Sequence, residues 1–469
     1  MPLSPPTETP ARRPNVVVVF GDQWRAIEHG YAGNTEVRTP NLDALAQESI
    51  DCTRCVATMP VCSPWRASLL TGQFPLTHGL FLNDLRLSDR SPKLGQCFVD
   101  AGYDTAWIGK WHVDGGGRGA PIPRERRCGF EHWRALECTH DYLRSAYHAG
   151  DETAARIWPG YDADAQTDEA VRWIEERRRA ERPFLAVLSW GPPHDPFRAC
   201  PPDLLAASDA RPPTPRPNVP ASEFERYRRD AAGYHAHIAA LDRCAGRLIR
   251  SLKQSGQWEN TVFVYTSDHG EMLGSHGMWK KQKPWDESIR VPLLVRVPGV
   301  RARRMDAPVE TPDLMPTLLG LAGIPVPSSV EGRDLAGVFR GKQKPDRDHA
   351  ALILCAAPFG EWAVANGGRA YRGVRTRRHT FVRDHSGDWL LTDNDDDPYQ
   401  LRNRVGDAAM RKVRDGLDER LRARLQATGD DFAAPDVLLR RCGYRVGANG
   451  TIDYQDPAQQ GQTTRDARG

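Results

Sequence analysis

The start of the sequence lacks a long hydrophobic run. The polar, proline-rich segment MPLSPPTETPARRP is followed by only five apolar residues, VVVVF. A secretion signal requires a longer apolar stretch, and a membrane-spanning helix requires about 20 apolar residues. We therefore expect a soluble, cytoplasmic protein that has neither a signal peptide nor a transmembrane segment.

The chain also lacks an excess of charge of either sign. Its 64 lysines and arginines nearly balance its 61 aspartates and glutamates, which leaves a net charge of +3. So small a charge creates no field that would attract nucleic acid or an anionic membrane, and neither is expected as a partner. The cluster of Arg124, Arg126 and Arg127 could contact an anionic substrate locally, although a solvated face is the commoner role of such a cluster.

The ten cysteines lack the arrangement of a zinc site or a disulfide framework. Cys52 and Cys55 have the spacing of half a zinc site, but no second pair follows at a suitable distance. In a long chain without a signal sequence, reduced cysteines are expected. Cys62 opens the stretch CSPWRASLLTG, where it could be a buried thiol, a disulfide half, a nucleophile or the precursor of another group.

The length and composition are those of a globular protein with a sizeable core. The 469 residues are 39% hydrophobic, enough for one large α/β domain with an appendage or for two or three domains. We expect a disordered N-terminus at 1–13, a catalytic domain at 14–345, a C-terminal subdomain at 346–444 and a mobile tail at 445–469. Within the subdomain, short alternating strands and turn residues predict an antiparallel sheet.

Strand-like and helix-like segments alternate along the first 300 residues. Expected strands lie at 15–20, 104–109, 183–190, 260–267 and 291–299, and expected helices at 39–50, 165–180 and 226–256. This alternation predicts an α/β fold with a large mixed, mostly parallel sheet flanked by helices. In such sheets, the chemistry gathers at the carboxyl ends of the strands.

Four polar residues stand at these strand ends and could converge on one site: Asp22, Lys110, His194 and Asp268. Asp22-Gln23 and Asp268-His269 together offer two carboxylates, an amide oxygen and an imidazole, which suit a hard divalent ion. Taken singly, each pair could equally form an ordinary turn with an aspartate cap.

The cationic residues predict binding of a tetrahedral oxyanion. Lys110, in IGKWH, and Lys281, in MWKKQK, could offset charge that builds on such a group, although either could be an ordinary surface lysine. His112 follows Lys110 by two residues. His194, flanked by prolines in GPPHDPF, is held stiffly enough to act as a general acid for a leaving group.

Together these motifs resemble the sulfatase family, which has the alkaline-phosphatase-like fold. Residues 62–72 match the family signature C-x-P-x-R-x-x-x-L-T-G. Five further segments resemble family segments and occur in the family's order: RPNVVVVFGDQ, GKWH, PPHDPF, SDHGEMLGSHG and ESIRVPLLVRVPG. With DNDDDPYQLRN at 393–403, the resemblance covers residues 13–405. It implies the α/β core described above and a smaller C-terminal α+β subdomain.

The resemblance implies that a separate maturation enzyme oxidises Cys62 to formylglycine (3-oxoalanine), whose hydrate is the nucleophile. It implies one divalent metal, Ca²⁺ or alternatively Mn²⁺, with these ligands: Asp22, Gln23, Cys62, Asp268 and His269. Arg66 is then expected to hold the hydrate, and His112 to help deprotonate it. Lys110 and Lys281 are expected to bind sulfate oxygens, and His194 to serve the leaving group with Lys281 as a possible sharer of that role.

One departure from the family pattern keeps the substrate open. Many sulfatases have two adjacent aspartates where this chain has Asp22-Gln23. This pairing resembles choline sulfatases, phosphonate monoester hydrolases and some bacterial polysaccharide sulfatases. The segment FPLTHGLFLND at 74–84 resembles carbohydrate sulfatases. We therefore expect a sulfuric ester hydrolase that acts on a sulfated small molecule or oligosaccharide. The alternatives are a phosphonate monoester or phosphodiester hydrolase using the same site, and a catalytically silent relative that binds sulfated glycans.

Overall fold

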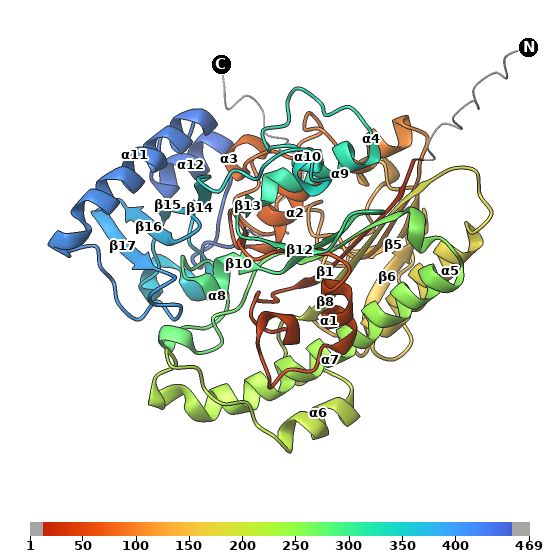
Figure 1. Ribbon diagram of the computed structural model, residues 1–469, viewed down its shortest axis with the longest axis horizontal. Coiled ribbons are helices and arrows are strands. Elements are labelled where there is room, and N and C mark those ends of the chain that lie inside the picture. The colour runs from red at the N-terminus through yellow and green to blue at the C-terminus, as the bar shows by residue number, and fades with distance from the viewer. Residues whose placement is uncertain (1–12, 453–469) are drawn as a thin grey trace, which may run out of the picture.

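A ten-stranded mixed sheet forms the centre of the computed structural model, which describes residues 13–452 (Figure 1). The strand order is β12-β2-β11-β9-β1-β8-β4-β5-β6-β7, and the central strands β9, β1, β8, β4 and β5 are parallel. The strands are β1 (Asn15–Asp22), β2 (Ile50–Cys52), β4 (Asp104–Lys110), β5 (His132–Leu136), β6 (Ala146–Ala149), β7 (Arg156–Ile157), β8 (Phe184–Pro193), β9 (Thr261–Ser267), β11 (Leu293–Arg296) and β12 (Arg303–Met305). The large, mostly parallel sheet predicted from the sequence is confirmed.

Helices cover both faces of this sheet (Figure 1). One layer contains α1 (Pro40–Ala46), α5 (Asp162–Glu176) and α7 (Phe224–Gln254), with α6 (Pro202–Asp209) packed on α7. The other contains α2 (Cys62–Thr71), α3 (Pro75–His78), α4 (Leu94–Asp100), α9 (Leu314–Ala322) and α10 (Ala336–Phe339). No helix among residues 13–452 combines the length and the apolarity that crossing a bilayer requires.

The sequence of β1 explains why it lies in the middle of the sheet. Val16, Val18 and Phe20 enter the core beneath α2 and α9, whereas Val17 and Val19 enter the core beneath α5 and α7. A strand buried on both faces has to be apolar at every position, and β-branched residues pack well on a pleated surface.

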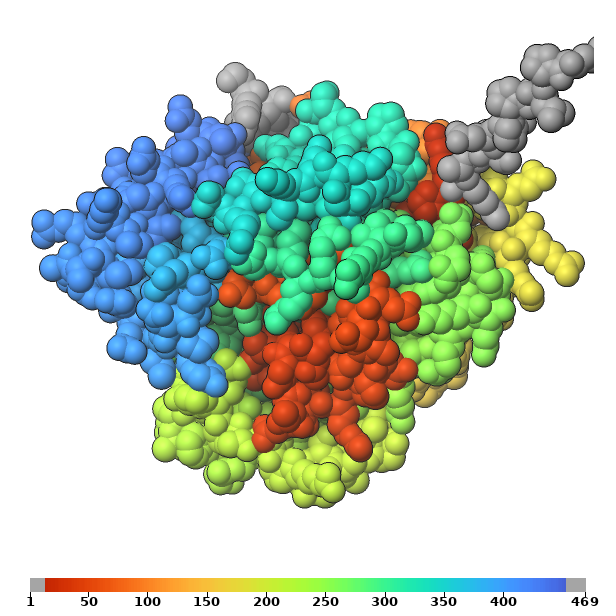
Figure 2. All heavy atoms as spheres, in the orientation of Figure 1, coloured from red at the N-terminus to blue at the C-terminus, as the bar shows by residue number. Residues whose placement is uncertain are grey.

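A four-stranded antiparallel sheet forms one end of the molecule, coloured blue in Figures 1 and 2. Its strands are β14 (Ala351–Cys355), β15 (Tyr371–Arg375), β16 (His379–Asp384) and β17 (Gly387–Asp393), and α11 (Arg411–Thr428) and α12 (Pro435–Cys442) follow it. A separate three-stranded sheet has the order β10 (Arg290–Val291), β3 (Cys55–Val56) and β13 (Val309–Glu310), and its strand β10 directly follows α8 (Asp286–Ile289). The predicted antiparallel sheet is therefore present, while the boundary at 345/346 stays a prediction.

Two expected elements differ from the structure. The helix expected at 39–50 ends at Ala46, because the chain turns there and enters β2 at Ile50. The strand expected at 291–299 is divided at Pro292, which has no amide hydrogen to continue a ladder, into β10 and β11. Of the predicted disordered start and mobile tail, residues 1–12 and 453–469 lie outside the described residues.

Candidate active site

The predicted strand-end residues meet at one edge of the sheet. Asp22 and Lys110 are the last residues of β1 and β4, and His194 and Asp268 directly follow β8 and β9. Because β9, β1, β8 and β4 are parallel neighbours, their carboxyl ends lie side by side. All four side chains are buried.

Cys62 lies at the centre of this edge. It begins α2, and its Sγ is 3.3 Å from His269 Nε2 and 3.6 Å from Asp22 Oδ1. One donor atom each from Asp22, Cys62, Asp268 and His269 lies within 4.8 Å of the others. These four predicted metal ligands are thus brought together.

Gln23, the fifth predicted ligand, lies next to this group. Its backbone N–H donates to Asp268 Oδ1 over 3.0 Å, and its side-chain Nε2 donates to Asp195 Oδ1 over 3.3 Å. The amide oxygen Oε1 is buried and has no hydrogen-bond partner within residues 13–452. A buried acceptor without a donor fits a cation, since two carboxylates, an amide oxygen and an imidazole form a hard donor set.

The chain bends tightly after β9 to place Asp268 and His269. A Cβ atom on Gly270 would lie 1.9 Å from the Glu287 carbonyl oxygen, so only glycine lets the loop pass this close to α8. The Gly270 N–H donates to the Ser288 carbonyl over 2.8 Å and fixes that approach. Around the site, Gln23, Asp84, His112, Lys280 and Gln282 all have positive φ, the kind of backbone strain that clusters at functional sites.

Arg66, one turn along α2 from Cys62, joins the two carboxylates. Its Nη2 donates to Asp22 Oδ2 over 3.1 Å and to Asp268 Oδ2 over 3.2 Å. Its Nη1 donates to the Lys110 carbonyl over 2.8 Å and to Ser189 Oγ over 2.7 Å. The guanidinium therefore holds one oxygen of each carboxylate and leaves the other oxygen toward Cys62 and His269.

The charges around position 62 favour an anion there. Burial and the Asp22 carboxylate oppose ionisation of Cys62, but Lys110, Lys281 and His269 outweigh them and hold the pKa of the thiol well below its usual range. Burial and the neighbouring Asp22 raise the pKa of Asp268 to about 6. A bound cation would relieve this repulsion between the carboxylates.

Lys110, Lys281 and His194 line the same space. Lys110 Nζ is 2.7 Å from Asp22 Oδ2, and Lys281 Nζ is 3.1 Å from Cys62 Sγ and 3.0 Å from His194 Nε2. His194 Nδ1 lies 2.7 Å from the Asp195 carbonyl oxygen, which can only accept, so Nδ1 carries the hydrogen and Nε2 accepts from Lys281. Burial and the Lys281 charge hold the pKa of His194 well below its usual range.

His112 is held by a residue that the sequence did not single out. Its Nε2 is 2.7 Å from Asp84 Oδ1, and Asp84 Oδ2 is 3.0 Å from Nη2 of the half-exposed Arg118. Burial opposes a charge on the imidazole, but Cys138, Asp84 and Cys62 together raise the pKa of His112 to about 10. Asp84 ends the segment FPLTHGLFLND, so a sequence signal was present without indicating this contact.

Two further residues at the site were missed. Ser189, inside β8, accepts from Arg66 and itself donates to the Lys110 carbonyl over 2.8 Å. The buried Cys138 lies 3.8 Å through Sγ from His140 Nε2. Burial opposes its ionisation, but Lys110, His112 and His140 lower the pKa of its thiol to about 5.

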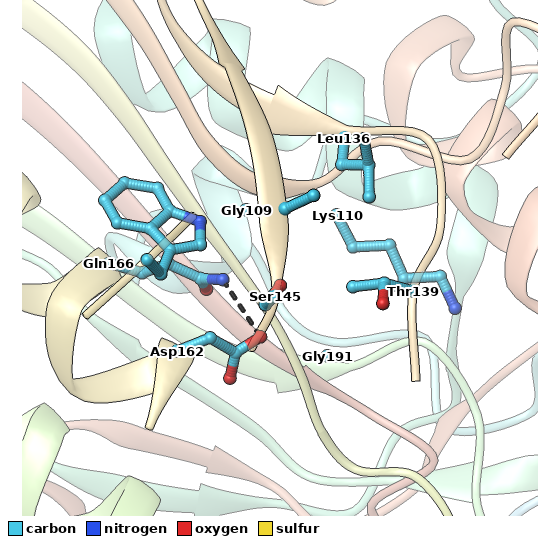
Figure 3. A pocket seen from close by; sticks show the side chains of 10 residues that line it. Gly109, Lys110, Leu136, Thr139, Ser145, Asp162, Gln166 and Gly191 are labelled. Atoms are coloured by element: carbon cyan, nitrogen blue, oxygen red, sulfur yellow. Dashed lines mark hydrogen bonds between the residues drawn. The ribbon is translucent and has the colours of Figure 1, made fainter. Parts of the chain in front are cut away.

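A small cavity lies behind Lys110 (Figure 3). Its volume of about 10 Å³ has room for one water molecule. Gln166 Nε2 donates to Asp162 Oδ2 over 3.3 Å, while Asp162 Oδ1 and Gln166 Oε1 are buried without partners in the part of the chain that is described. Burial raises the pKa of Asp162 to about 8.

Comparison with known proteins identifies relatives of this chain. A family model described as Sulfatase matches residues 14–324, and one described as N-sulphoglucosamine sulphohydrolase, C-terminal, matches residues 274–427. The ulvan-active sulfatase of Formosa agariphila is 40% identical over 93% of this chain and 86% of its own length. The N-acetylglucosamine-6-O-sulfatase of Bacteroides thetaiotaomicron is 24% identical over 87% of this chain and 85% of its own length.

Two solved structures show the same fold. The putative sulfatase yidJ from Bacteroides fragilis has a TM-score of 0.81 at 28% identity, covering 91% of this chain and 98% of its own. The phosphonate monoester hydrolase of Agrobacterium radiobacter has a TM-score of 0.68 at 26% identity, covering 88% of this chain and 96% of its own.

Proposed function

We propose, on the premise that this chain belongs to the sulfatase family and hydrolyses sulfate esters, that its substrate is a sulfated carbohydrate and its nucleophile a formylglycine made from Cys62. The observation that carries this proposal is the setting of Cys62, buried 3.1 Å from Lys281 Nζ and 3.3 Å from His269 Nε2 at the strand ends. The names of the ulvan-active and N-acetylglucosamine-6-O-sulfatase relatives support a carbohydrate, and ulvan is the first polymer to test.

The metal-binding role falls to Asp22, Gln23, Asp268, His269 and the group at position 62. This oxygen-rich set suits Ca²⁺ best, with Mn²⁺ as the alternative. When bound, the cation would lower the pKa of an oxygen nucleophile and offset charge on the sulfate. The unpartnered Gln23 Oε1 supports its place in the set.

The hydrated aldehyde at position 62 would supply one hydroxyl that attacks sulfur and a second whose deprotonation releases the sulfate. His112 would meet this second hydroxyl through Nδ1, because Asp84 fixes its Nε2. To accept the proton it has to be neutral, and replacing the Cys62 thiol, which raises the pKa of His112, with an uncharged hydrate favours that form. Lys110 and Lys281 bind the sulfate oxygens and offset the charge that develops in the transition state.

His194 and Lys281 serve the leaving alcohol as a pair. One mobile proton lies between Lys281 Nζ and His194 Nε2, which are 3.0 Å apart. When the ester bond breaks, this proton passes to the alkoxide oxygen, and a neutral leaving group departs. The hydrogen bond from His194 Nδ1 to the Asp195 carbonyl holds the imidazole in the tautomer that this transfer needs.

A second candidate function is phosphonate monoester hydrolysis by the same residues. The Asp22-Gln23 pairing and the structural likeness to the Agrobacterium radiobacter enzyme favour it. A metal site with one carboxylate fewer carries less negative charge, which eases the approach of a phosphonate or phosphodiester anion.

The test is to produce the protein together with a formylglycine-generating enzyme and to measure the mass of the peptide that contains residue 62. An aldehyde or its hydrate is expected, with the Cys62→Ala protein as the control for peptide assignment. An intact thiol together with no turnover of any sulfate ester contradicts the proposal and favours a silent glycan-binding protein. A kcat/KM for aryl phosphonates above that for aryl sulfates selects the second candidate.

A further inference from the structure

Beside the candidate site lies a cavity of about 250 Å³ that the proposed mechanism does not use. Its walls come from the loop after β8, the first turns of α7 and the loop after β9, including Asp195, Arg226, Asp230, Glu271, Trp279 and Lys280. Asp195 and Lys280 follow and precede the proposed catalytic residues His194 and Lys281 in the chain. Lys280 Nζ is 3.4 Å from Asp195 Oδ2, so this pair forms the wall between the cavity and the site.

A buried carboxylate holds the loop that forms one wall of the cavity. Glu271 is fully buried, and its Oε1 accepts from the backbone N–H groups of Leu273, over 2.8 Å, and Lys280, over 2.6 Å. Its Oε2 has no hydrogen-bond partner among the residues that the structure describes. Through Oε1, Glu271 therefore fixes the backbone at both ends of the loop 273–280, which carries the cavity-lining Trp279 and Lys280.

The charged side chains that line the cavity do not favour an anionic ligand. Arg226 lies 3.4 Å from Asp230, and its guanidinium stacks 3.7 Å from the centre of the Trp279 ring. Lys280 is paired with Asp195, so these cations are already compensated by carboxylates. Mixed charges with an aromatic wall suit an uncharged, hydroxyl-rich ring, whose hydroxyls both donate and accept.

We infer that this cavity is a subsite for the sugar ring next to the sulfated one, so that the enzyme prefers sulfated oligosaccharides to sulfated monosaccharides. The inference rests on the proposed function. The volume is just below the range of drug-sized pockets, about 300–1,000 Å³, and suits one ring rather than a longer segment. Its position beside His194 places this ring on the leaving-group side.

The experiment uses the matured full chain and a double variant, Arg226→Ala with Asp230→Asn, which alters the wall that α7 contributes. The matched control is Arg228→Ala, on the same exposed part of α7 but stacked over Phe224 instead of lining the cavity. The substrates are nitrophenyl sulfate, sulfated monosaccharides, and ulvan and sulfated N-acetylglucosamine oligosaccharides.

The double variant is expected to lose about tenfold or more in kcat/KM for the oligosaccharide that the parent enzyme cleaves best, because the Arg226 guanidinium is lost and the Asp230 carboxylate becomes a neutral, weaker acceptor. Nitrophenyl sulfate turnover and the Arg228→Ala control should remain within about twofold of the parent. Equal losses on all substrates, or a parent kcat/KM that does not rise from monosaccharides to oligosaccharides, overturns the subsite. Failure of the proposed function is distinct, since the parent would then hydrolyse no sulfate ester at all.

Discussion

Cys62 combines a buried position with cationic neighbours from two separate segments. Lys110 ends β4, while His269 and Lys281 lie in the loop after β9, and all three favour negative charge at position 62. Cys355 shows the opposite tendency, because burial outweighs the charges of Arg372 and Lys283 and raises the pKa of its thiol to about 12. The chemistry at position 62 therefore follows from its setting rather than from the residue type.

Cys62→Ala is expected to abolish turnover and to leave the fold intact. The variant removes the precursor of the nucleophile but only one buried atom, so the melting temperature should change by no more than a few degrees. Rates with nitrophenyl sulfate and a thermal unfolding curve check both parts. Multiple turnover by this variant would end the mechanism proposed for position 62.

His194→Ala is expected to slow the hydrolysis of alkyl sulfates by roughly 10²-fold or more, and the hydrolysis of nitrophenyl sulfate much less. An alkoxide leaves poorly unless it is protonated, whereas nitrophenolate is stable as an anion, so only the first needs a general acid. The measurement is kcat for a series of esters that differ in the pKa of the alcohol. Equal losses across the series would remove the His194–Lys281 pair from the leaving-group role.

At the scale of single residues, the sequence predicted the site residues whose positions follow from the order of the strands. It missed those whose positions depend on how the loops bend. Asp22, Lys110, His194 and Asp268 could be grouped because parallel strands align their ends. Asp84 could not be linked to His112, because the two residues are 28 positions apart and lie in different loops. Both residues have positive φ, a backbone conformation that the sequence did not indicate. The roles carried by resemblance alone remain predictions.

Among the elements, α5 has the feature with the clearest pH consequence. Asp162 lies in its first turn against the cavity behind Lys110, where burial raises its pKa from the ordinary 3.8 to about 8. Between these two values the folded protein keeps a proton that the unfolded chain has released. The stabilising effect of that proton is therefore complete below about pH 4 and is lost as the pH rises toward 8.

Asp162→Asn is expected to reduce the pH dependence of the unfolding free energy. Between about pH 5 and about pH 8, the parent should lose on the order of 3 kcal/mol more unfolding free energy than the variant, because the amide does not ionise. Urea denaturation at both pH values provides the measurement. Asp168→Asn, on an exposed position of the same helix, should follow the parent; parallel losses in parent and Asp162→Asn would contradict the assignment.

The central elements were predictable because their sequence patterns match their burial. Strands β1, β4, β8 and β9 are apolar runs that end at glycine or polar residues, and α7 has apolar residues at helical spacing. The division of the expected strand at 291–299 depends on which partner each half finds. Local sequence does not specify that pairing, since β10 joins β3 and β11 joins β9.

Across the whole molecule, the C-terminal sheet supports the loop that carries Lys281. Arg375, on β15, donates through Nε and Nη2 to the two oxygens of Asp286, over 2.9 and 3.0 Å. Gln282 Nε2 donates to the Phe359 carbonyl over 2.9 Å, and the Phe359 N–H donates back to Gln282 Oε1 over 3.2 Å. The loop that carries Lys281 and the C-terminal part are thus joined on both sides of Lys283.

Arg375→Met is expected to destabilise the protein by about 3–5 kcal/mol, because it leaves the mostly buried Asp286 without its bidentate partner. Arg377→Met, two residues away and half-exposed, should cost less than about 1 kcal/mol. Denaturant curves followed by tryptophan fluorescence and by circular dichroism check both values. A C-terminal part that melts separately, with the catalytic signal unchanged, would refute the coupling.

The reciprocal bonds between Gln282 and Phe359 span 77 residues of chain, and the exposed stretch at 340–348 lies between them. If the polypeptide is divided in that stretch, one fragment retains Cys62 and Lys281 but loses the backbone that holds Gln282. The other fragment retains the support without any catalytic group. Sulfate release would then report that the two fragments have found each other, which makes this loop the natural place to build a split-enzyme sensor.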